Sequence, residues 1–116
     1  MRRSLIAGNW KMNGSVAMTD GLLTGLKKGI VQSIPDVDIV VCPPFLYIPL
    51  AVQMLVGSTI RVGAQNLDIH GSGAYTGEIA AEMLKEQHCG YVIVGHSERR
   101  ALYGESSDLV DRKSVV

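Results

Sequence analysis

Four short apolar runs alternate along the chain with segments of helical pattern, and this alternation restricts the possible folds more than any other feature. The runs are rich in β-branched residues and interrupted by small ones, as is typical of buried parallel strands. They cover residues 5–9, 37–41, 60–65 and 91–94, and the helical segments are expected at 16–31, 47–55, 78–87 and from 106 onward. This βαβαβαβα order predicts an α/β fold with a parallel sheet and right-handed crossovers.

The expected helix boundaries rest on local signals. Ser15 precedes the first helical segment as a cap, and Pro49 falls in the first turn of the second. Thr76 is expected to cap the third helix, which would begin at Glu78, close to its positive end. The fourth helix is expected to begin near Ser106. These signals agree with the alternation.

Two architectures fit the alternation, namely an open doubly wound sheet and an arc of a (β/α)₈ barrel. The first strand is followed by GNWKMNG at residues 8–14, so neither GxGxxG nor GxxxxGK[ST] occurs there. This weakens the case for a doubly wound nucleotide-binding domain. Strand order separates the two, because a barrel keeps the sequential order 1-2-3-4 whereas the open sheet reverses at a crevice.

Charge and cysteine content exclude several classes of partner. The 116 residues carry 11 basic and 11 acidic side chains, so no long-range attraction to nucleic acid or to a membrane is expected. Cys42 and Cys89 form neither a CxxC pair nor a zinc pattern, and they are expected to be small buried thiols of a cytoplasmic protein. No metal and no cofactor are expected. The length suits one domain or part of one.

Polar side chains gather where three of the predicted strands end. Because the carboxyl ends of parallel strands share one rim, these side chains are expected to converge. A lysine beside an asparagine on such a rim suits a small anionic ligand. Ser97 is expected to cap a helical turn there, with Glu98 at its positive end. The residues concerned are Asn9, Lys11, Gln65, Asn66, His96, Ser97 and Glu98.

Several long motifs in register resemble triosephosphate isomerase. They are AGNWKMNG at 7–14, CPPFLY at 42–47, VGAQN at 62–66, GAYTGE at 73–78, VGHSERR at 94–100 and YGES at 103–106. The resemblance covers essentially the whole chain and implies the N-terminal half of a (β/α)₈ TIM barrel. It further implies interconversion of dihydroxyacetone phosphate and glyceraldehyde 3-phosphate, in glycolysis and gluconeogenesis, and a homodimer.

The resemblance also assigns roles to individual residues. Asn9 and Lys11 resemble the substrate-binding pair, with Lys11 also offsetting charge on the enediolate. His96 resembles the catalytic electrophile, and the family is itself a standard example of an imidazole held neutral by a helix N-terminus. Ser97 and Glu98 resemble supports of the site, with Glu98 near Lys11. The remaining assignments are a structural ion pair between Arg99 and Glu105, and dimer-interface positions at Gln65 and Thr76.

No segment of the chain resembles the one that carries the family's glutamate base, or its later phosphate-binding loops. Residues 1–116 are therefore expected to form an incomplete single TIM-barrel domain, from the first strand to the start of the fourth helix, with little or no activity by itself. Open edges at the first and fourth strands are expected to make it prone to association. The alternative is a non-catalytic half-barrel that binds phosphate or serves assembly. His70 is expected to be solvated, and Trp10 to pack under the first loop.

Overall fold

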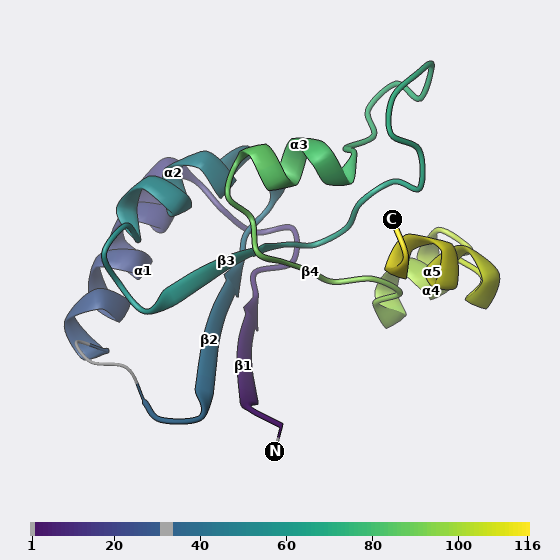
Figure 1. The fold of residues 1–116 in the computed structure, drawn as a ribbon. Helices are drawn as coiled ribbons and strands as arrows, with labels where there is room; N and C mark the ends of the chain where they lie inside the picture. Colours follow the sequence, from purple (N-terminus) through teal and green to yellow (C-terminus); the bar gives the residue numbers. More distant parts are fainter. Residues whose placement is uncertain (1, 31–33) are drawn as a thin grey trace.

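The chain forms a four-stranded parallel sheet in the order β1-β2-β3-β4 (Figure 1). The computed structural model describes residues 2–30 and 34–116. The strands are β1 (Ser4–Asn9), β2 (Val37–Cys42), β3 (Ile60–Ala64) and β4 (Tyr91–Val92). This sequential order has no reversal. The prediction of a curled half-barrel is therefore confirmed, and the alternative of a doubly wound sheet is wrong.

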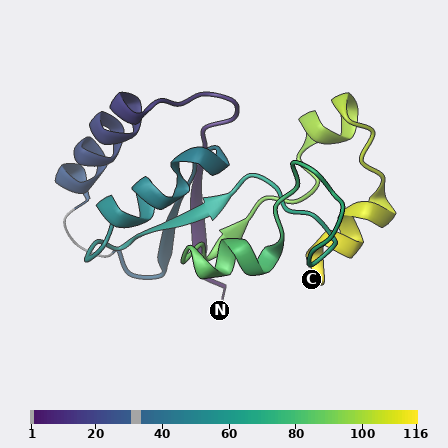
Figure 2. The same cartoon turned by 90° about the horizontal axis from the view of Figure 1, so that it is seen from above.

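Helices cover one face of this sheet and continue beyond its last strand. They are α1 (Val16–Gly29), η1 (Phe45–Tyr47), α2 (Ile48–Met54), α3 (Ala81–Glu86), α4 (Ser97–Leu102) and α5 (Ser107–Ser114). Helices α1, α2 and α3 lie together along the sheet, whereas α4 and α5 lie past the carboxyl end of β4 (Figures 1 and 2). None of the helices in the described ranges is long and apolar enough to cross a membrane.

The helix starts follow the expected chemistry in three places. The Ser15 side chain accepts a hydrogen bond from the Met18 amide and caps α1. Pro49 stands in the first turn of α2, and the Ser106 side chain caps α5 by accepting from the Leu109 amide. Val31, the last residue of the predicted first helix, lies outside the described residues.

The core lies between the sheet and the helices. Leu23 of α1, Ile48 of α2 and Leu84 of α3 pack there with Val41 and Val62 of the sheet. Each such side chain stabilises the fold by about 1.5–3 kcal/mol through burial. Trp10, directly after β1, belongs to the same cluster, and its predicted packing under the first loop is consistent with this position.

The opposite face of the sheet is closely packed around Gly63. A Cβ at this position would lie 2.8 Å from the sulfur of Cys42 and 3.1 Å from the Cβ of Tyr91. Cys42 is buried, and burial together with the neighbouring Cys89 raises the pKa of its thiol to about 11. Burial likewise raises the pKa of Cys89, which is half-buried. Both cysteines are therefore protonated thiols at neutral pH.

The third helix begins later than the sequence predicts. Helix α3 starts at Ala81, and its cap residue Ala80 makes no side-chain cap, so the assignments of Thr76 as the cap and of Glu78 as the first residue are wrong. The reason is that residues before Ala80 belong to a loop: the carbonyl of Ile79 accepts from the Asp68 amide at 2.8 Å. Gly77, with φ of 94°, also interrupts a helical backbone there.

The fourth strand is shorter than its apolar run. Regular pairing covers Tyr91 and Val92, and one more bond follows, from the Ile93 amide to the carbonyl of Ala64. The chain then turns at Gly95, which has φ of 65° and lies so close to Val110 that a Cβ would clash with its side chain. Glycine thus ends the strand here for two reasons, backbone conformation and space.

Residues 66–79 form an arm that projects from the body of the molecule (Figure 1). Its ends are joined by the bond between Asp68 and Ile79. His70, which was predicted to be solvated, is partly exposed: its side chain keeps 36% of its accessible surface, and its ring stacks on Tyr75 with centroids 3.6 Å apart. Its Nδ1 also lies 2.7 Å from Asp68 Oδ2. Hydrogen bonds from His70 lower the pKa of Asp68, chiefly the one donated by its backbone amide.

Candidate active site

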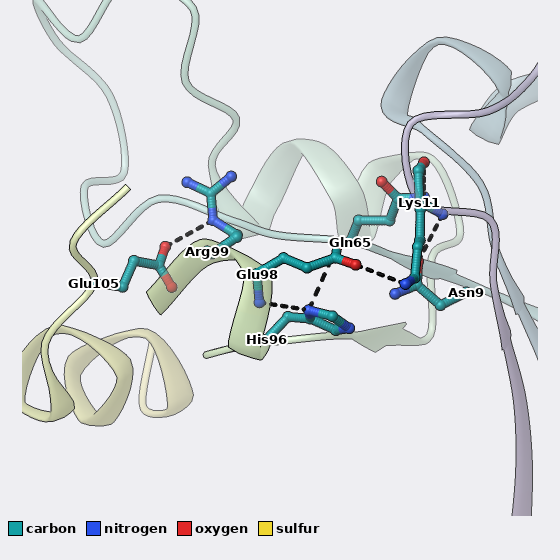
Figure 3. Close-up of polar contacts among 7 residues, drawn as sticks. All are labelled: Asn9, Lys11, Gln65, His96, Glu98, Arg99 and Glu105. Carbon is teal, nitrogen blue, oxygen red and sulfur yellow. Dashed lines mark hydrogen bonds and ion pairs between the residues drawn. The ribbon is translucent and has the colours of Figure 1, made fainter. Parts of the chain in front are cut away.

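The side chains of Asn9, Lys11 and His96 line one cleft of about 390 Å³ at the carboxyl ends of the strands. Figure 3 shows Asn9 and Lys11 on one side and His96 on the other, with Glu98 and Gln65 between them. Asn9 is the last residue of β1, Lys11 follows that strand, and His96 follows β4, so they come from the two edges of the sheet. The sequential, curled sheet brings these segments to one rim, as strand-end reasoning predicts.

Lys11 has a backbone conformation that is unusual for a residue with a side chain. Its φ of 56° lies in the left-handed region, which costs about 1–2 kcal/mol for residues other than glycine. Both of its backbone polar groups are held: its amide donates to Asn9 Oδ1 at 2.9 Å, and its carbonyl accepts from Gln65 Nε2 at 2.8 Å. These two bonds offset the strain and fix the direction in which the lysine side chain leaves the chain.

Gln65 therefore has an internal role that sequence reasoning missed. Its amide nitrogen also donates to the carbonyl of Cys42 at 2.9 Å, so it links the ends of β1, β2 and β3. Its predicted role at a dimer interface stays a prediction. Thr76, the other predicted interface residue, is exposed in the arm and does not line the cleft.

The ammonium of Lys11 forms an ion pair with Glu98, with Nζ 2.6 Å from Oε1. The hydrogen bond from Lys11 lowers the pKa of Glu98, and the charge of Lys11 acts in the same direction. Both side chains are about half exposed, so solvent screens this pair and its effect is mainly to orient the lysine. Glu98 is thus ionised and engaged.

His96, and not Ser97, caps helix α4. The Nδ1 atom of His96 accepts a hydrogen bond from the Glu98 amide at 3.1 Å, whereas Ser97 is already the first helical residue. The reason is geometric: His96 keeps a non-helical backbone with ψ of 141°, which lets its ring reach the free amide two residues on. An Nδ1 that accepts has no proton, so the neutral ring carries its proton on Nε2.

A buried ion cluster supports the far side of the cleft. Glu105 Oε2 accepts from Arg99 Nε at 2.8 Å, as the predicted structural pair requires, and from Lys113 Nζ at 2.5 Å. Lys113 in turn donates to Asn66 Oδ1 at 2.8 Å. Burial raises the pKa of Glu105, but the hydrogen bonds and charges of Lys113 and Arg99 outweigh it, and the net pKa lies below the ordinary value.

Lys113 is the member of this cluster that sequence reasoning missed. A lysine in the last turn of a short polar helix is normally exposed to solvent, yet Lys113 is only 5% exposed. The signal that identifies it is three-dimensional, because its partners Asn66 and Glu105 come from two different loops. Within residues 2–30 and 34–116, no three His, Cys, Asp or Glu side chains are grouped to hold a metal ion.

Comparison with known proteins identifies the family. The family model for triosephosphate isomerase matches residues 4–115. The chain belongs to the triosephosphate isomerase family. Among its curated relatives, the triosephosphate isomerase of Methylococcus capsulatus is 54% identical over 110 residues, which cover 95% of this chain and 43% of that protein. The enzyme of Nitrosococcus oceani is 51% identical over 116 residues, covering 100% of this chain and 46% of that protein.

The chain spans somewhat less than half the length of these triosephosphate isomerases. A third relative, from Magnetococcus marinus, is 48% identical over 113 residues and is covered to 44% of its length. The resemblance to the N-terminal half of the family is therefore confirmed, and so is the half-barrel fold. Except for Leu102, the residues that line the cleft lie within the motifs that resemble this family.

Proposed function

We propose that this chain carries the substrate-binding and electrophilic part of a triosephosphate isomerase site. The reaction is the interconversion of dihydroxyacetone phosphate and glyceraldehyde 3-phosphate by proton transfer through an enediolate. The observation that supports it best is that Asn9 and Lys11, at the end of β1, line one cleft with His96, which follows β4 at the opposite edge of the sheet. An amide, a cation and an imidazole N–H are the groups that a phosphorylated hydroxycarbonyl compound requires.

In this proposal each side chain has a distinct role. The Lys11 ammonium offsets negative charge on the phosphate and on the developing enediolate. Asn9 holds the Lys11 amide and binds substrate. His96 donates its Nε2 proton to the substrate carbonyl oxygen and moves protons between the two oxygens, because its Nδ1 is already occupied by the Glu98 amide. Ser97 and Glu98 act as supports.

The general base is proposed to lie outside residues 1–116. Among the described residues, Glu98 supplies the one carboxylate that lines the cleft, and Lys11 holds it in an ion pair. Because a general base contributes about 10² to 10⁴ in rate, the chain alone is expected to have little or no turnover. The domain is proposed to be an incomplete single barrel. The enzyme to which it belongs is proposed to be cytoplasmic and free of cofactors, to act in glycolysis and gluconeogenesis, and to dimerise through Gln65 and Thr76.

The second candidate function is a half-barrel that binds phosphate without catalysis. It is favoured by the same observation, since the cleft offers a cation and donors while its carboxylate is engaged. The two candidates differ in what the imidazole does. An isomerase site prefers an enediolate-like ligand through His96 Nε2, whereas a phosphate site is indifferent to it.

A titration of the 116-residue chain with 2-phosphoglycolate and with inorganic phosphate tests both candidates. The planar carboxylate of 2-phosphoglycolate resembles an enediolate, so the isomerase proposal expects it to bind about tenfold tighter or more than phosphate, with NMR shifts at His96 and Lys11. His96→Gln should remove this preference, and Lys11→Met should weaken both ligands. Equal affinity for the two ligands favours the non-catalytic candidate, and absence of saturable binding contradicts both. Turnover of glyceraldehyde 3-phosphate by the chain alone would contradict the proposed location of the base.

A further inference from the structure

The loop that carries Lys11 joins β1 to α1 and has little packing of its own. Lys11 keeps a strained backbone, with φ of 56°, and the next residue, Met12, is 95% exposed. A strained backbone persists only where the surrounding structure holds it firmly. Asn9 and Gln65 hold Lys11 from the side of the sheet (Figure 3). The residues that follow Lys11 therefore need a restraint on the side of α1.

The restraint on the side of α1 is a close contact between Gly14 and the ring of Tyr47. A Cβ at Gly14 would lie 2.8 Å from Cε2 and 2.9 Å from Cδ2 of that ring, nearer than nonbonded carbon atoms approach each other. The backbone of Gly14 is not left-handed, so space rather than conformation requires glycine here. The side-chain amide of Asn13 donates to the carbonyl of Trp10 at 3.0 Å and closes the turn between them. The end of the loop thus lies directly against Tyr47.

Tyr47 is a firm support for this contact. It ends η1, and its amide donates to the carbonyl of Pro44 at 3.0 Å. Pro43 and Ile48, on either side of this turn, are fully buried. The backbone of Tyr47 is therefore tied to the core. Because an aromatic side chain has two rotatable bonds, a backbone fixed in this way leaves the ring little freedom.

We propose that Tyr47 is a positioning residue of the candidate site. Its ring holds the end of the loop, and the held loop keeps Lys11 paired with Glu98. The ring acts through the backbone, because Tyr47 does not line the cleft. The strain at Lys11 corresponds to a factor of about 5 to 30 in population, so a loop released at Gly14 lets Lys11 leave its paired position. The consequence for substrate rests on the proposed function, whereas the effect on the ion pair does not.

The pKa of Glu98 reports on this ion pair and is measured by NMR of its carboxyl carbon. The hydrogen bond from Lys11 lowers that pKa, so Tyr47→Ala is expected to raise it toward the ordinary 4.5. Tyr47→Phe keeps the ring carbons that contact Gly14 and is expected to leave the pKa unchanged. Circular dichroism of each variant verifies that it is folded. A loss of stability alone, in a variant that is still folded, does not move the pKa of Glu98.

Gly14→Ala disturbs the same contact from the side of the loop and is also expected to raise the pKa of Glu98. Its matched control is Gly25→Ala, because a Cβ at Gly25 in α1 meets nothing within 4 Å. In the double variant Gly14→Ala/Tyr47→Ala the methyl group takes space that the ring has left, so the pKa should be no higher than in Tyr47→Ala alone. An unchanged pKa in either folded single variant overturns the proposal, and so do effects that add in the double variant.

Titration with 2-phosphoglycolate shows whether this positioning matters for the substrate. Tyr47→Ala is expected to weaken binding about fivefold or more, the low end of the population factor, while Tyr47→Phe binds as tightly as the unaltered chain. Failure of the unaltered chain to bind this compound contradicts the proposed function alone, because the pKa of Glu98 is measured without ligand. If the unaltered chain does bind it, an unchanged affinity in Tyr47→Ala overturns the role of Tyr47 in the site.

Discussion

Replacement of Glu105 by glutamine is expected to cost this fold about 3 kcal/mol of unfolding free energy. The carboxylate is 3% exposed and holds Lys113, which is 5% exposed. Glutamine keeps the shape and one acceptor oxygen but removes the charge, so the buried ammonium is left with neutral amide oxygens only, that of the new side chain and that of Asn66. Breaking a buried ion pair costs about 3–5 kcal/mol, and the remaining acceptor places this variant at the lower end. Against a total stability of about 5–15 kcal/mol this is a large loss.

Urea unfolding followed by circular dichroism measures this effect. The double variant Glu105→Leu/Lys113→Met removes both charges and should recover most of the loss, since well-packed apolar replacements of buried pairs are often neutral. Asp38→Asn serves as the control, because its partner Arg3 is half exposed and surface pairs contribute about 0–1 kcal/mol. A Glu105→Gln variant as stable as the control variant would refute the reasoning, as would a double variant less stable than the single one.

Three further outcomes are expected. The pKa of Glu105 lies below its ordinary 4.5 in the folded chain, so its stabilising effect is present above pH 4.5 and is lost as the pH falls through the lower folded value. Urea unfolding at a series of pH values should show this loss of unfolding free energy in acid, and Glu105→Gln should reduce it. Gly63→Ala should cost about 1–3 kcal/mol in thermal unfolding, because its Cβ would lie 2.8 Å from the Cys42 sulfur, whereas Gly8→Ala, with its nearest contact at 4.0 Å, should cost far less. Gln65→Leu should raise the pKa of Glu98, because it releases Lys11, whose hydrogen bond lowers that pKa. NMR of the Glu98 carboxyl carbon measures the pKa, and an unchanged value would show that Gln65 does not position Lys11.

The fold could be predicted from the sequence to the level of strand order, because its signals are local and repeated. Short β-branched runs, a capping serine at Ser15 and a proline at Pro49 each act within a few residues. The start of the third helix was mispredicted because a tertiary bond, from the Asp68 amide to Ile79, holds the preceding residues in the arm. Local capping chemistry at Thr76 cannot compete with that long-range pairing.

The same distinction between local signals and tertiary contacts applies to the candidate site. The convergence of Asn9, Lys11 and His96 follows from the rule that parallel strands end on one rim, so residue type and position were enough. The contacts that orient those side chains could not be predicted, since they join distant segments: Gln65 to the Lys11 carbonyl, and Lys113 to Asn66. The identity of the α4 cap depended on one backbone angle, that of His96, which the sequence does not specify.

The arm formed by residues 66–79 contains several of the contacts that shape it. The stack of His70 on Tyr75 and the bonds between His70 and Asp68 join residues only a few positions apart. Closing such small loops takes well under a microsecond and needs no sheet behind it. If it is transplanted between two anchored ends of an unrelated scaffold, the segment is therefore expected to keep its bend. Its ends, in contrast, are anchored in the body of the molecule, where Leu67 packs in the core and Asn66 accepts from Lys113.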